Sequence, residues 1–414
     1  MRSKRVFPLW LIMMLVLAAC VPNSVSEGDL VQAENPIVQP IPTNTANQTT
    51  DEQEQIPTET FLPEQAPPRG AAVEFSTDFS KHTVNYDEIL SGGPPKDGIP
   101  AIDRPRFVTV AEADAWLKPV EPVVIVEVGD DARAYPIQVL MWHEIANDTV
   151  GGLPLAVTFC PLCNTAIVFE RTVDGQVLDF GTTGRLRFSN LIMYDRQTET
   201  WWQQASGEAI AGEQTGKRLA FYPGAIISWA DFKAAHPDGQ VLSRETGFSR
   251  AYGDNPYAGY DDVNRPPFLY QGPETPGVLP PVTRVLTVDL NGDAVAYPYD
   301  ILEEERVIND TVGGQQVVVF WTEGTASALD AGSVAGGRDV GATNAYLRVV
   351  DDQALRFTVQ DGQITDEETG SQWDILGQAI SGDYAGKQLE PVIAINHFWF
   401  SWAAFRPDTR VYQP

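Results

Sequence analysis

The chain of 414 residues has only three cysteines and four histidines, which limits the catalytic groups available to it. Positive charge is also scarce: 28 Lys and Arg residues stand against 56 Asp and Glu, for a formal net charge of −28. Such acidity argues against nucleic acid or anionic lipid as a partner, and solubility alone explains it equally well. The chain contains no His-Glu-x-x-His, no Gly-x-Ser-x-Gly and no phosphate-binding glycine loop, so familiar hydrolase and nucleotide signatures are absent.

Long hydrophobic runs are missing beyond the start of the chain, and no later stretch is long enough to span a bilayer. Residues 1–20 contain three basic residues, an apolar run and then Leu-Ala-Ala-Cys, the pattern of a secretory signal peptide. That tetrapeptide resembles a bacterial lipobox, which implies cleavage before Cys20 and lipid on its thiol and new amino terminus. We therefore expect an extracytoplasmic protein held on the cell membrane through Cys20. An ordinary signal peptide or an uncleaved anchor is the alternative.

Residues 21–70 are rich in Pro, Gln, Thr, Asn and Glu and have almost no aromatic side chains. A segment of this composition cannot bury enough apolar surface to offset its ordering entropy, so we expect a disordered tether. Nearly all Trp, Tyr and Phe residues follow it, in enough chain for two domains. Removal of the three basic residues with the leader gives a mature net charge of −28 − 3 = −31.

An internal repeat relates residues 134–166 to residues 296–328, an offset of 296 − 134 = 162. Both copies keep Ala-Tyr-Pro, Asn-Asp-Thr-Val-Gly-Gly and the apolar run that follows. The offset replaces three chemically distinctive residues: Cys160 by Thr322, Cys163 by Thr325 and His143 by Glu305. The fold therefore does not need these three side chains, whether the second copy lost them with a function or by drift.

Short apolar runs bounded by Gly, Asp and Asn predict mostly strands, with short helices over residues 136–146 and 228–236. We expect an α+β fold dominated by β structure, with two tandem homologous β-rich domains as a pseudo-symmetric pair. The predicted segments are an N-terminal extension packed on the first domain (71–121), a first, site-bearing repeat domain (122–245), an aromatic joining loop (246–281) and a degenerate second repeat domain (282–414).

The Cys-Pro-Leu-Cys motif at Cys160 and Cys163 allows three interpretations outside the cytoplasm. A structural disulfide closing so small a loop constrains the unfolded chain little. A thiol–disulfide redox site is the second, although the strand-like residues after Cys163 lack the helix that would lower the thiol pKa. The third is a metal-binding turn, with His143 as the nearest third ligand. A Cys₂His set with an open position suits zinc or copper.

Other polar residues without counterparts in the second copy could line a pocket beside the cysteines, although a solvated polar loop is the simpler explanation for most of them. The candidates are Ser189, Asn190, Arg250, Tyr252, Tyr257 and His82.

The strings KDGIPAID, AYPIQVLMWHEIANDTVGG, FCPLCNTA, MYDRQTETWW, SGEAIAG and DNPYAGYDD together resemble an uncharacterised bacterial and archaeal family, domain-of-unknown-function family three-one-seven-nine. The resemblance covers about residues 79–262 well and the second copy more weakly. Members commonly have Gly after the second cysteine, where this chain has Asn164, and the Gly form is better suited to binding metal. The resemblance implies an exported context and supplies no reaction.

We expect an exported, membrane-tethered lipoprotein with a Cys160–Cys163–His143 metal or redox site in its first repeat; whether it is an enzyme stays open. The alternative is a non-catalytic surface lipoprotein that binds a ligand or partner, its cysteines forming a plain disulfide. The sequence identifies no protein or small-molecule partner beyond the membrane.

Overall fold

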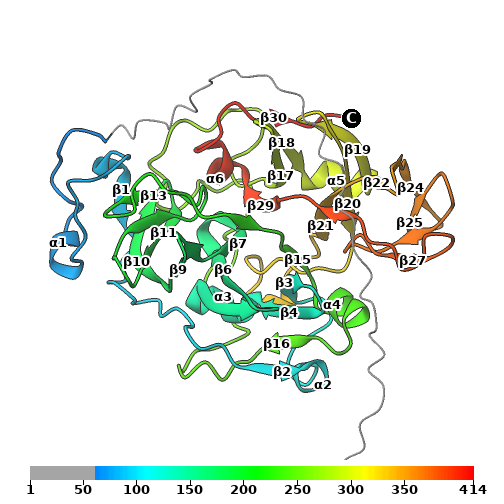
Figure 1. Ribbon diagram of the computed structural model, residues 1–414, viewed down its shortest axis with the longest axis horizontal. Coiled ribbons are helices and arrows are strands. Elements are labelled where there is room, and N and C mark those ends of the chain that lie inside the picture. Colours follow the sequence, from blue (N-terminus) through cyan, green and yellow to red (C-terminus); the bar gives the residue numbers. More distant parts are fainter. Residues whose placement is uncertain (1–60) are drawn as a thin grey trace, which may run out of the picture. The chain divides into compact units, whose positions relative to one another are not determined.

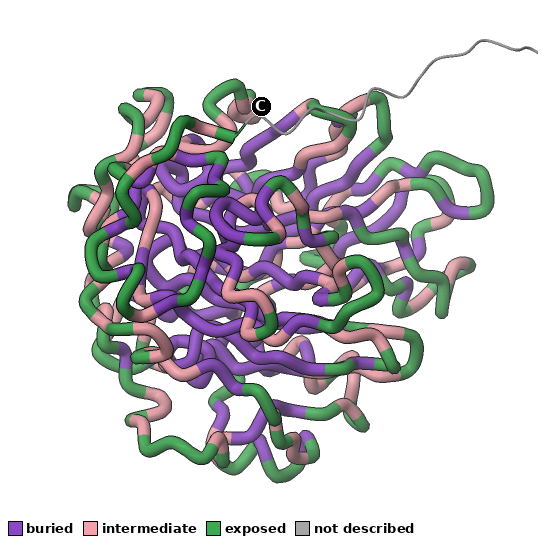
Figure 2. Tube along the Cα trace, turned by 60° about the vertical axis from the view of Figure 1, so that its left-hand side comes forward, coloured by how far each residue is buried: buried purple, intermediate pink, exposed green. Residues whose placement is uncertain are grey.

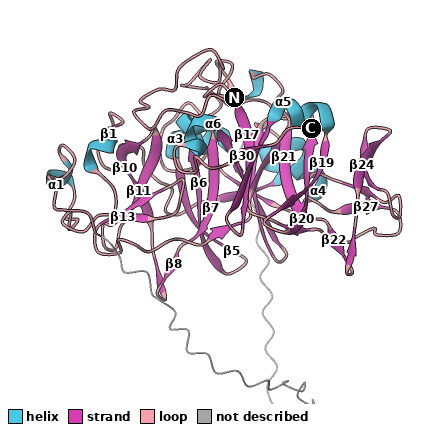
Figure 3. Ribbon diagram, turned by 90° about the horizontal axis from the view of Figure 1, so that it is seen from above, coloured by secondary structure: helices cyan, strands magenta, loops and turns pink. Residues whose placement is uncertain are grey.

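The computed structural model describes residues 61–414, and these belong to one compact unit. The expected signal peptide, Cys20 and most of the expected tether lie outside the described residues. Strands hold 40% of the residues and helices 12%, which confirms a β-dominated protein with short helices (Figure 3). No helix in residues 61–414 is both long and apolar enough to cross a membrane.

The first repeat and the segment before it contain three main sheets (Figure 1). Their strands are β1 (Ile89–Ser91), β2 (Phe107–Thr109), β3 (Pro122–Val128), β4 (Asp131–Pro136), β5 (Ile145–Val150), β6 (Leu153–Cys160), β7 (Thr165–Glu170), β10 (Phe180–Arg187), β11 (Asn190–Asp195), β12 (Trp201–Gln203), β13 (Ala209–Ala211), β14 (Phe221–Tyr222), β15 (Ala225–Ser228) and β16 (Gln240–Leu242). The strand orders are β15-β3-β4-β16-β2, β14-β7-β6-β5 and β1-β10-β11-β12-β13.

The second repeat also contains three main sheets. Their strands are β17 (Arg284–Leu290), β18 (Asp293–Pro298), β19 (Val307–Val312), β20 (Gln315–Thr322), β21 (Ala342–Leu347), β24 (Phe357–Gln360), β25 (Gln363–Asp366), β26 (Gln372–Trp373), β27 (Ala379–Ser381), β28 (Glu390–Pro391), β29 (Ala394–Phe398) and β30 (Arg410–Val411). The strand orders are β29-β17-β18-β30, β19-β20-β21-β28 and β24-β25-β26-β27. Two small hairpins complete the sheets: β8 (Thr172–Val173) with β9 (Gln176–Val177), and β22 (Val349–Val350) with β23 (Gln353–Ala354).

The strand orders of the two halves correspond. The series β15-β3-β4-β16 matches β29-β17-β18-β30, and β5-β6-β7-β14 matches β19-β20-β21-β28. Each half also contains one parallel pair in the same place, β4 with β16 and β18 with β30, in sheets that are otherwise antiparallel. A duplicated unit would produce this agreement, which includes the long connection that each parallel pair needs.

The described helices are all short. They are α1 (Ala71–Glu74), α2 (Val110–Ala113), α3 (Ile137–His143), α4 (Trp229–Ala235), α5 (Tyr299–Glu305) and α6 (Trp399–Ala403), with 3₁₀ turns η1 (Tyr86–Glu88), η2 (Pro161–Cys163) and η3 (Val334–Gly336).

Both predicted helices are confirmed. The first, α3, begins directly after Pro136 and ends earlier than expected, because Glu144 adopts a left-handed conformation with φ 58° that turns the chain into β5. The second, α4, is capped by Ser228, whose hydroxyl accepts the Asp231 backbone N–H at 3.0 Å.

The connection after the cysteine motif differs between the halves. Cys160 pairs with Thr165 across the β6–β7 hairpin, and Thr322 pairs with Ala342 across β20 and β21. Only residues 161–164 connect β6 to β7, whereas residues 323–341 connect β20 to β21. Cys160 and Thr322 therefore occupy equivalent strand positions, as expected. Pairing Cys163 with Thr325 by the same offset is wrong, because Thr325 lies inside this longer insertion.

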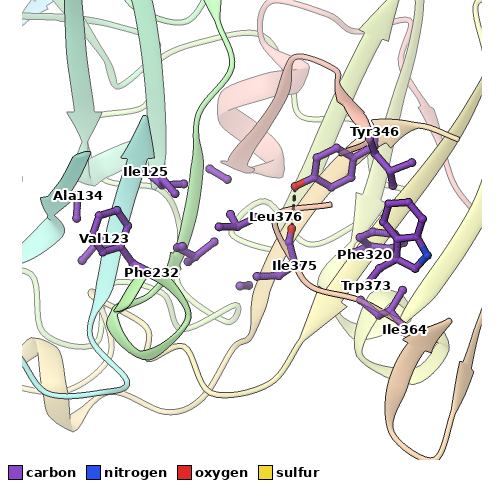
Figure 4. Packing of buried hydrophobic residues seen from close by; sticks show 14 of the residues in the cluster. Val123, Ile125, Ala134, Phe232, Phe320, Tyr346, Ile364, Trp373, Ile375 and Leu376 are labelled. Carbon is purple, nitrogen blue, oxygen red and sulfur yellow. Dashed lines mark hydrogen bonds between the residues drawn. The ribbon is translucent and has the colours of Figure 1, made fainter. Parts of the chain in front are cut away.

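One hydrophobic core joins the two repeats (Figure 4). Ile125 and Phe232 of the first repeat belong to the same buried cluster as Phe320 and Trp373 of the second. Figure 2 shows the buried stretches running through the interior of the folded body, with exposed stretches around its edge. A fully buried side chain of this size contributes about 1.5–3 kcal/mol. The repeats therefore pack as one unit and share the stability of this core.

The segment before the first repeat adds edge strands to it: β1 pairs with β10, and β2 pairs with β16. Contacts with the folded body begin earlier than the expected end of the tether at residue 70. The Leu62 backbone N–H donates to the His82 carbonyl, and Gln65 Oε1 accepts the Tyr86 backbone N–H, each at 3.0 Å. These hydrogen bonds offset part of the ordering entropy that composition alone assigns to the segment.

His397 lies on β29, where the second repeat contacts the first. Its Nδ1 lies 2.8 Å from the Thr165 hydroxyl, and its Nε2 has no partner within residues 61–414. The imidazole is fully buried, and burial lowers the pKa of His397 to about 3. A neutral ring is therefore part of this contact between the repeats.

This burial predicts a specific acid sensitivity. The unfolded His397 has a pKa near 6.5, so its stabilising effect is complete above about pH 6.5 and is lost as pH falls towards 3, by on the order of 4 kcal/mol. In urea denaturation between pH 7 and pH 4, the stability advantage of wild type over His397→Gln should shrink as pH falls. The variant His236→Gln, at a partly buried histidine whose Nε2 lies 3.1 Å from Glu127, serves as the comparison histidine. Equal pH slopes for wild type and His397→Gln would refute the prediction.

Candidate functional site

The cysteine motif forms the tight connection between β6 and β7. Cys160 ends β6, η2 follows, and Asn164 takes the left-handed conformation (φ 50°, ψ 41°) that returns the chain to β7. Gly adopts this conformation freely and Asn is the commonest substitute for it, because its short polar side chain tolerates left-handed backbone. Asn164 therefore supports the same turn that Gly would make.

This turn brings the two sulfur atoms together. Both cysteines are free thiols and buried, Cys160 2% exposed and Cys163 fully enclosed. The Cys160 Sγ–H donates to Cys163 Sγ at 3.1 Å. Cys163 Sγ–H donates in turn to the Ser189 carbonyl at 3.3 Å. The pair is thus a hydrogen-bonded dithiol closed off from solvent.

Two predicted pocket residues, Ser189 and Asn190, lie directly against the sulfurs. They come from the turn between β10 and β11, where Phe188 and Ser189 both have positive φ. Asn190 is fully buried, and its Nδ2 donates to Cys163 Sγ at 3.3 Å and to Gln204 Oε1 at 2.8 Å. Its Oδ1 accepts the Ala205 backbone N–H at 2.9 Å. Asn190 is therefore fixed in place with a donor aimed at the second cysteine.

Glu144, which sequence reasoning missed, ends α3, and its carbonyl accepts the backbone N–H of Phe159, the residue before Cys160, at 2.8 Å. Burial raises the pKa of the Glu144 carboxyl to about 8. The pKa of Cys160 is raised well above its usual range, mainly by burial, then by Cys163, and also by the charge of Glu144. The repeat could have drawn attention to Glu144. The 162-residue offset that replaces His143 also places Arg306 at the position of Glu144.

The joining loop covers the dithiol. The Tyr260 hydroxyl donates to the Leu162 carbonyl at 2.9 Å, inside the cysteine motif. The Phe268 backbone N–H donates to the Tyr260 hydroxyl at 3.3 Å, and the Ser189 hydroxyl donates to the Phe268 carbonyl at 2.6 Å. The predicted pocket residue Tyr257 also lies here, and its pKa is raised mainly by burial and further by the charges of Glu144 and Cys160.

The insertion of the second repeat supports this cover. The backbone N–H groups of Gly259 and Tyr260 donate to the carbonyls of Asp330 and Leu329 at 2.7 and 3.1 Å. The Val334 backbone N–H donates to the Gly253 carbonyl at 2.9 Å. Residues 323–341 therefore hold the joining loop over the first repeat.

His143 is buried at the end of α3, with both ring nitrogens in hydrogen bonds. Its Nδ1 lies 2.7 Å from the Pro100 carbonyl, which can only accept, so Nδ1 carries the proton. Its Nε2 then accepts from the Tyr252 hydroxyl at 2.6 Å. Burial chiefly lowers the pKa of His143, and the nearby charge of Arg250 lowers it further, so the ring is neutral.

The expected three-residue metal site is not assembled in this arrangement. Among residues 61–414, no group of three or more His, Cys, Asp or Glu side chains is placed to hold a metal ion. His143 is hydrogen-bonded to Tyr252 and is affected by the charge of Arg250, while the cysteines have Ser189 and Asn190 as polar neighbours. Zinc or copper binding stays a prediction.

His82, the remaining predicted pocket residue, belongs to another part of the molecule. It is fully buried, its Nδ1 lies 2.9 Å from the Val84 carbonyl, and its ring stacks on Tyr86. Its backbone forms a bridge with Ala211. These contacts give His82 a packing role beside the N-terminal segment.

Comparison with known families gives one assignment. The family described as Protein of unknown function (DUF3179) matches residues 96–409, so the chain belongs to that family. The match spans both repeats, the joining loop and the cysteine motif. No curated protein and no solved structure matches the chain.

Asn190 should be a major contributor to stability as well as to the site. Asn190→Ala would leave Gln204 Oε1 and the Ala205 N–H without their buried hydrogen-bond partner, so we expect the free energy of unfolding to fall by about 2–4 kcal/mol. Asn264→Ala, in an exposed part of the joining loop, should change it by less than about 0.5 kcal/mol. Urea denaturation of both variants measures these changes. Equal losses of unfolding free energy in the two variants would contradict the role given to Asn190.

Proposed function

We propose that this DUF3179 protein is an extracytoplasmic, membrane-tethered thiol–disulfide redox protein whose Cys160 and Cys163 interconvert between dithiol and disulfide. The observation that carries the proposal is the pair of free, buried sulfurs 3.1 Å apart, hydrogen-bonded to each other. The redox reaction is the chemistry that two adjacent thiols perform without a third ligand.

Electrostatics favour a redox couple at this position. Burial strongly disfavours charged sulfur and raises the pKa of Cys160, against the smaller opposing effect of a hydrogen bond from the Leu191 backbone N–H. A dithiol and a disulfide are both neutral, so the pocket accommodates both ends of the couple. A bound metal would require two thiolates in the same enclosed space.

Two alternatives are less well supported. A plain disulfide across so short a loop would add little stability, and the second repeat forms the equivalent strand with Thr322 in place of Cys160. A Cys₂His metal site would need His143 to give up a ring hydrogen bond to Pro100 or Tyr252. The polar donor from Asn190 fits the redox proposal, since it stabilises sulfur whenever Cys163 becomes a thiolate.

The test is a redox titration of the full-length protein, purified without reductant or chelator. Samples equilibrated in glutathione or dithiothreitol buffers from about −120 to −300 mV are quenched in acid, alkylated and digested with trypsin. Mass spectrometry then reads the state of the peptide of residues 134–171, which holds both cysteines and separates them from Cys20. We expect reversible, two-electron conversion in the folded protein.

Cys160→Ser and Cys163→Ser should each abolish the conversion while leaving the unfolding midpoint close to wild type. Metal analysis on the same preparation completes the experiment. A pair that stays in one state across the whole range contradicts the proposal. Near-stoichiometric zinc or copper that blocks alkylation of both thiols contradicts it as well.

The membrane tether is a separate part of the proposal and rests on the lipobox-like sequence before Cys20. Cys20→Ala should prevent lipid attachment, so labelling with a radioactive fatty acid is lost and the protein is released or retains its leader. The redox titration of residues 134–171 should not change in this variant. Continued membrane attachment together with lipid labelling would overturn the assignment.

A further inference from the structure

Behind Asn190 lies a chain of buried polar side chains that begins at a cysteine sulfur. Asn190 Nδ2 donates to Cys163 Sγ at 3.3 Å and to Gln204 Oε1 at 2.8 Å. Gln204 Nε2 donates to the Thr158 hydroxyl at 3.0 Å and to the Thr165 carbonyl at 3.2 Å. Thr158, Asn190 and Gln204 are all fully buried. The chain therefore connects Cys163 to β6 and β7, the strands on either side of the cysteine turn.

Two backbone groups fix the orientation of both amides in this chain. The Ala205 backbone N–H can only donate, and it lies 2.9 Å from the amide oxygen of Asn190, so the nitrogen of that amide faces Cys163. The Thr165 carbonyl can only accept, so Gln204 turns its nitrogen towards β7 and its oxygen towards Asn190. Both hydrogens of Asn190 Nδ2 thus have an acceptor, one on sulfur and one on Gln204. Gln204 therefore joins the Asn190 amide to the strands.

The Asn190 amide is one of three contacts around the sulfur of Cys163. The Ser189 carbonyl accepts from this sulfur at 3.3 Å, and Cys160 Sγ lies 3.1 Å from it. A separation of about 3–3.5 Å is the one at which two bound groups are poised to react, and a displacement of about 1 Å can slow a reaction strongly. Whatever fixes the Asn190 amide therefore affects how readily the two sulfurs form a bond.

The second repeat has apolar side chains at positions where the first repeat has this polar chain. The strand registers equate Thr158 with Phe320 and Thr165 with Ala342. Phe320 and Ala342 are fully buried and belong to the hydrophobic core that the two repeats share. The hairpin therefore forms without a hydroxyl at either position.

The same contrast holds at Gln204. Trp202 and Trp373 occupy equivalent positions, since each donates its indole N–H at 2.9 Å to the aspartate that ends the neighbouring strand. Gln204 and Ile375 each follow two residues later, and Ile375 is a buried member of the shared core. Burial of an amide destabilises a fold unless its hydrogen bonds are satisfied, whereas burial of an apolar side chain stabilises it. The polar chain occurs in the repeat that has the cysteines.

We propose that Gln204 is a positioning residue for the cysteine pair: it holds the Asn190 amide against Cys163 and so keeps the two sulfurs within closing distance. This inference rests on the proposed redox function, and it adds the residue that sets the geometry of disulfide closure. Gln204 acts through Asn190, and Thr158 supports Gln204 from β6.

The reaction that reports this geometry is closure of the pair by oxidised glutathione. One cysteine sulfur attacks the glutathione disulfide, which forms a mixed disulfide and releases one glutathione. The other cysteine then attacks the protein sulfur of the mixed disulfide, which closes the Cys160–Cys163 bond and releases the second glutathione. The pair loses two electrons and two protons, and the two released glutathione thiols gain them. The second step is intramolecular, so its rate depends on how the sulfurs are placed.

The test measures this closing step in full-length protein mixed with oxidised glutathione, by acid quench, alkylation and mass spectrometry of residues 134–171. Gln204→Leu removes both polar ends of the side chain at similar volume and should slow closure about 10-fold. Thr158→Val should slow it about 3-fold, because Gln204 loses one acceptor, and Thr158→Ser should match wild type. Asn309→Ala controls for lost stability: it removes two hydrogen bonds to backbone groups of the second repeat and should close at the wild-type rate.

A second comparison tests whether Gln204 acts through Asn190. In an Asn190→Ala background, Gln204→Leu should leave the closing rate unchanged, because the amide that Gln204 holds is gone. Undiminished slowing in that background, or a Gln204→Leu single variant that closes like wild type, would overturn the inference. If wild type itself does not form the disulfide, the proposed redox function fails instead, so the two failures are distinguishable. If Gln204→Leu does not fold, the Thr158 variants decide, and equal rates for Thr158→Val and Thr158→Ser would overturn the inference.

Discussion

Exclusion of water from the Cys160–Cys163 pair is the constraint on which the rest of the site depends. The β6–β7 turn places the sulfurs together, and the joining loop closes over them through Tyr260 and Phe268. Enclosure keeps Cys160 protonated and raises the pKa of Glu144. In such an enclosed site, a hydrogen bond from Asn190 would stabilise a buried thiolate that has few other sources of stabilisation.

The sequence repeat has the scaffold residues in both copies and the cysteines in one, although the second copy still contributes to the site. Its strands follow the order of the first repeat, and its buried side chains complete the shared core. Its insertion, residues 323–341, hydrogen-bonds to the joining loop and so supports the cover of the cysteines. A repeat without the cysteines has thereby kept a role in enclosing those of its neighbour.

Much of this arrangement could be predicted from the sequence. Apolar alternation, the Pro136 start and the Ser228 cap predicted β dominance and both short helices, because these signals act locally. The position of the insertion in the second repeat could not be predicted. The residues after Thr322 resemble those after Cys160 closely enough by chance that the alignment continues there without a gap. The partners of His143 could not be predicted either, because Pro100 and Tyr252 are distant in sequence. Glu144 was recoverable from the repeat, by its replacement with Arg306.

Crystal structures of the full-length protein in excess dithiothreitol and after oxidation, with anomalous data collected at the zinc and copper edges, test the central claim most directly. The redox account predicts two separate sulfurs without metal in the reduced crystal and a Cys160–Cys163 bond in the oxidised crystal. The β6–β7 hairpin should be unchanged between them. A metal ion on both sulfurs, or a disulfide that survives the reductant in the folded protein, would contradict that account.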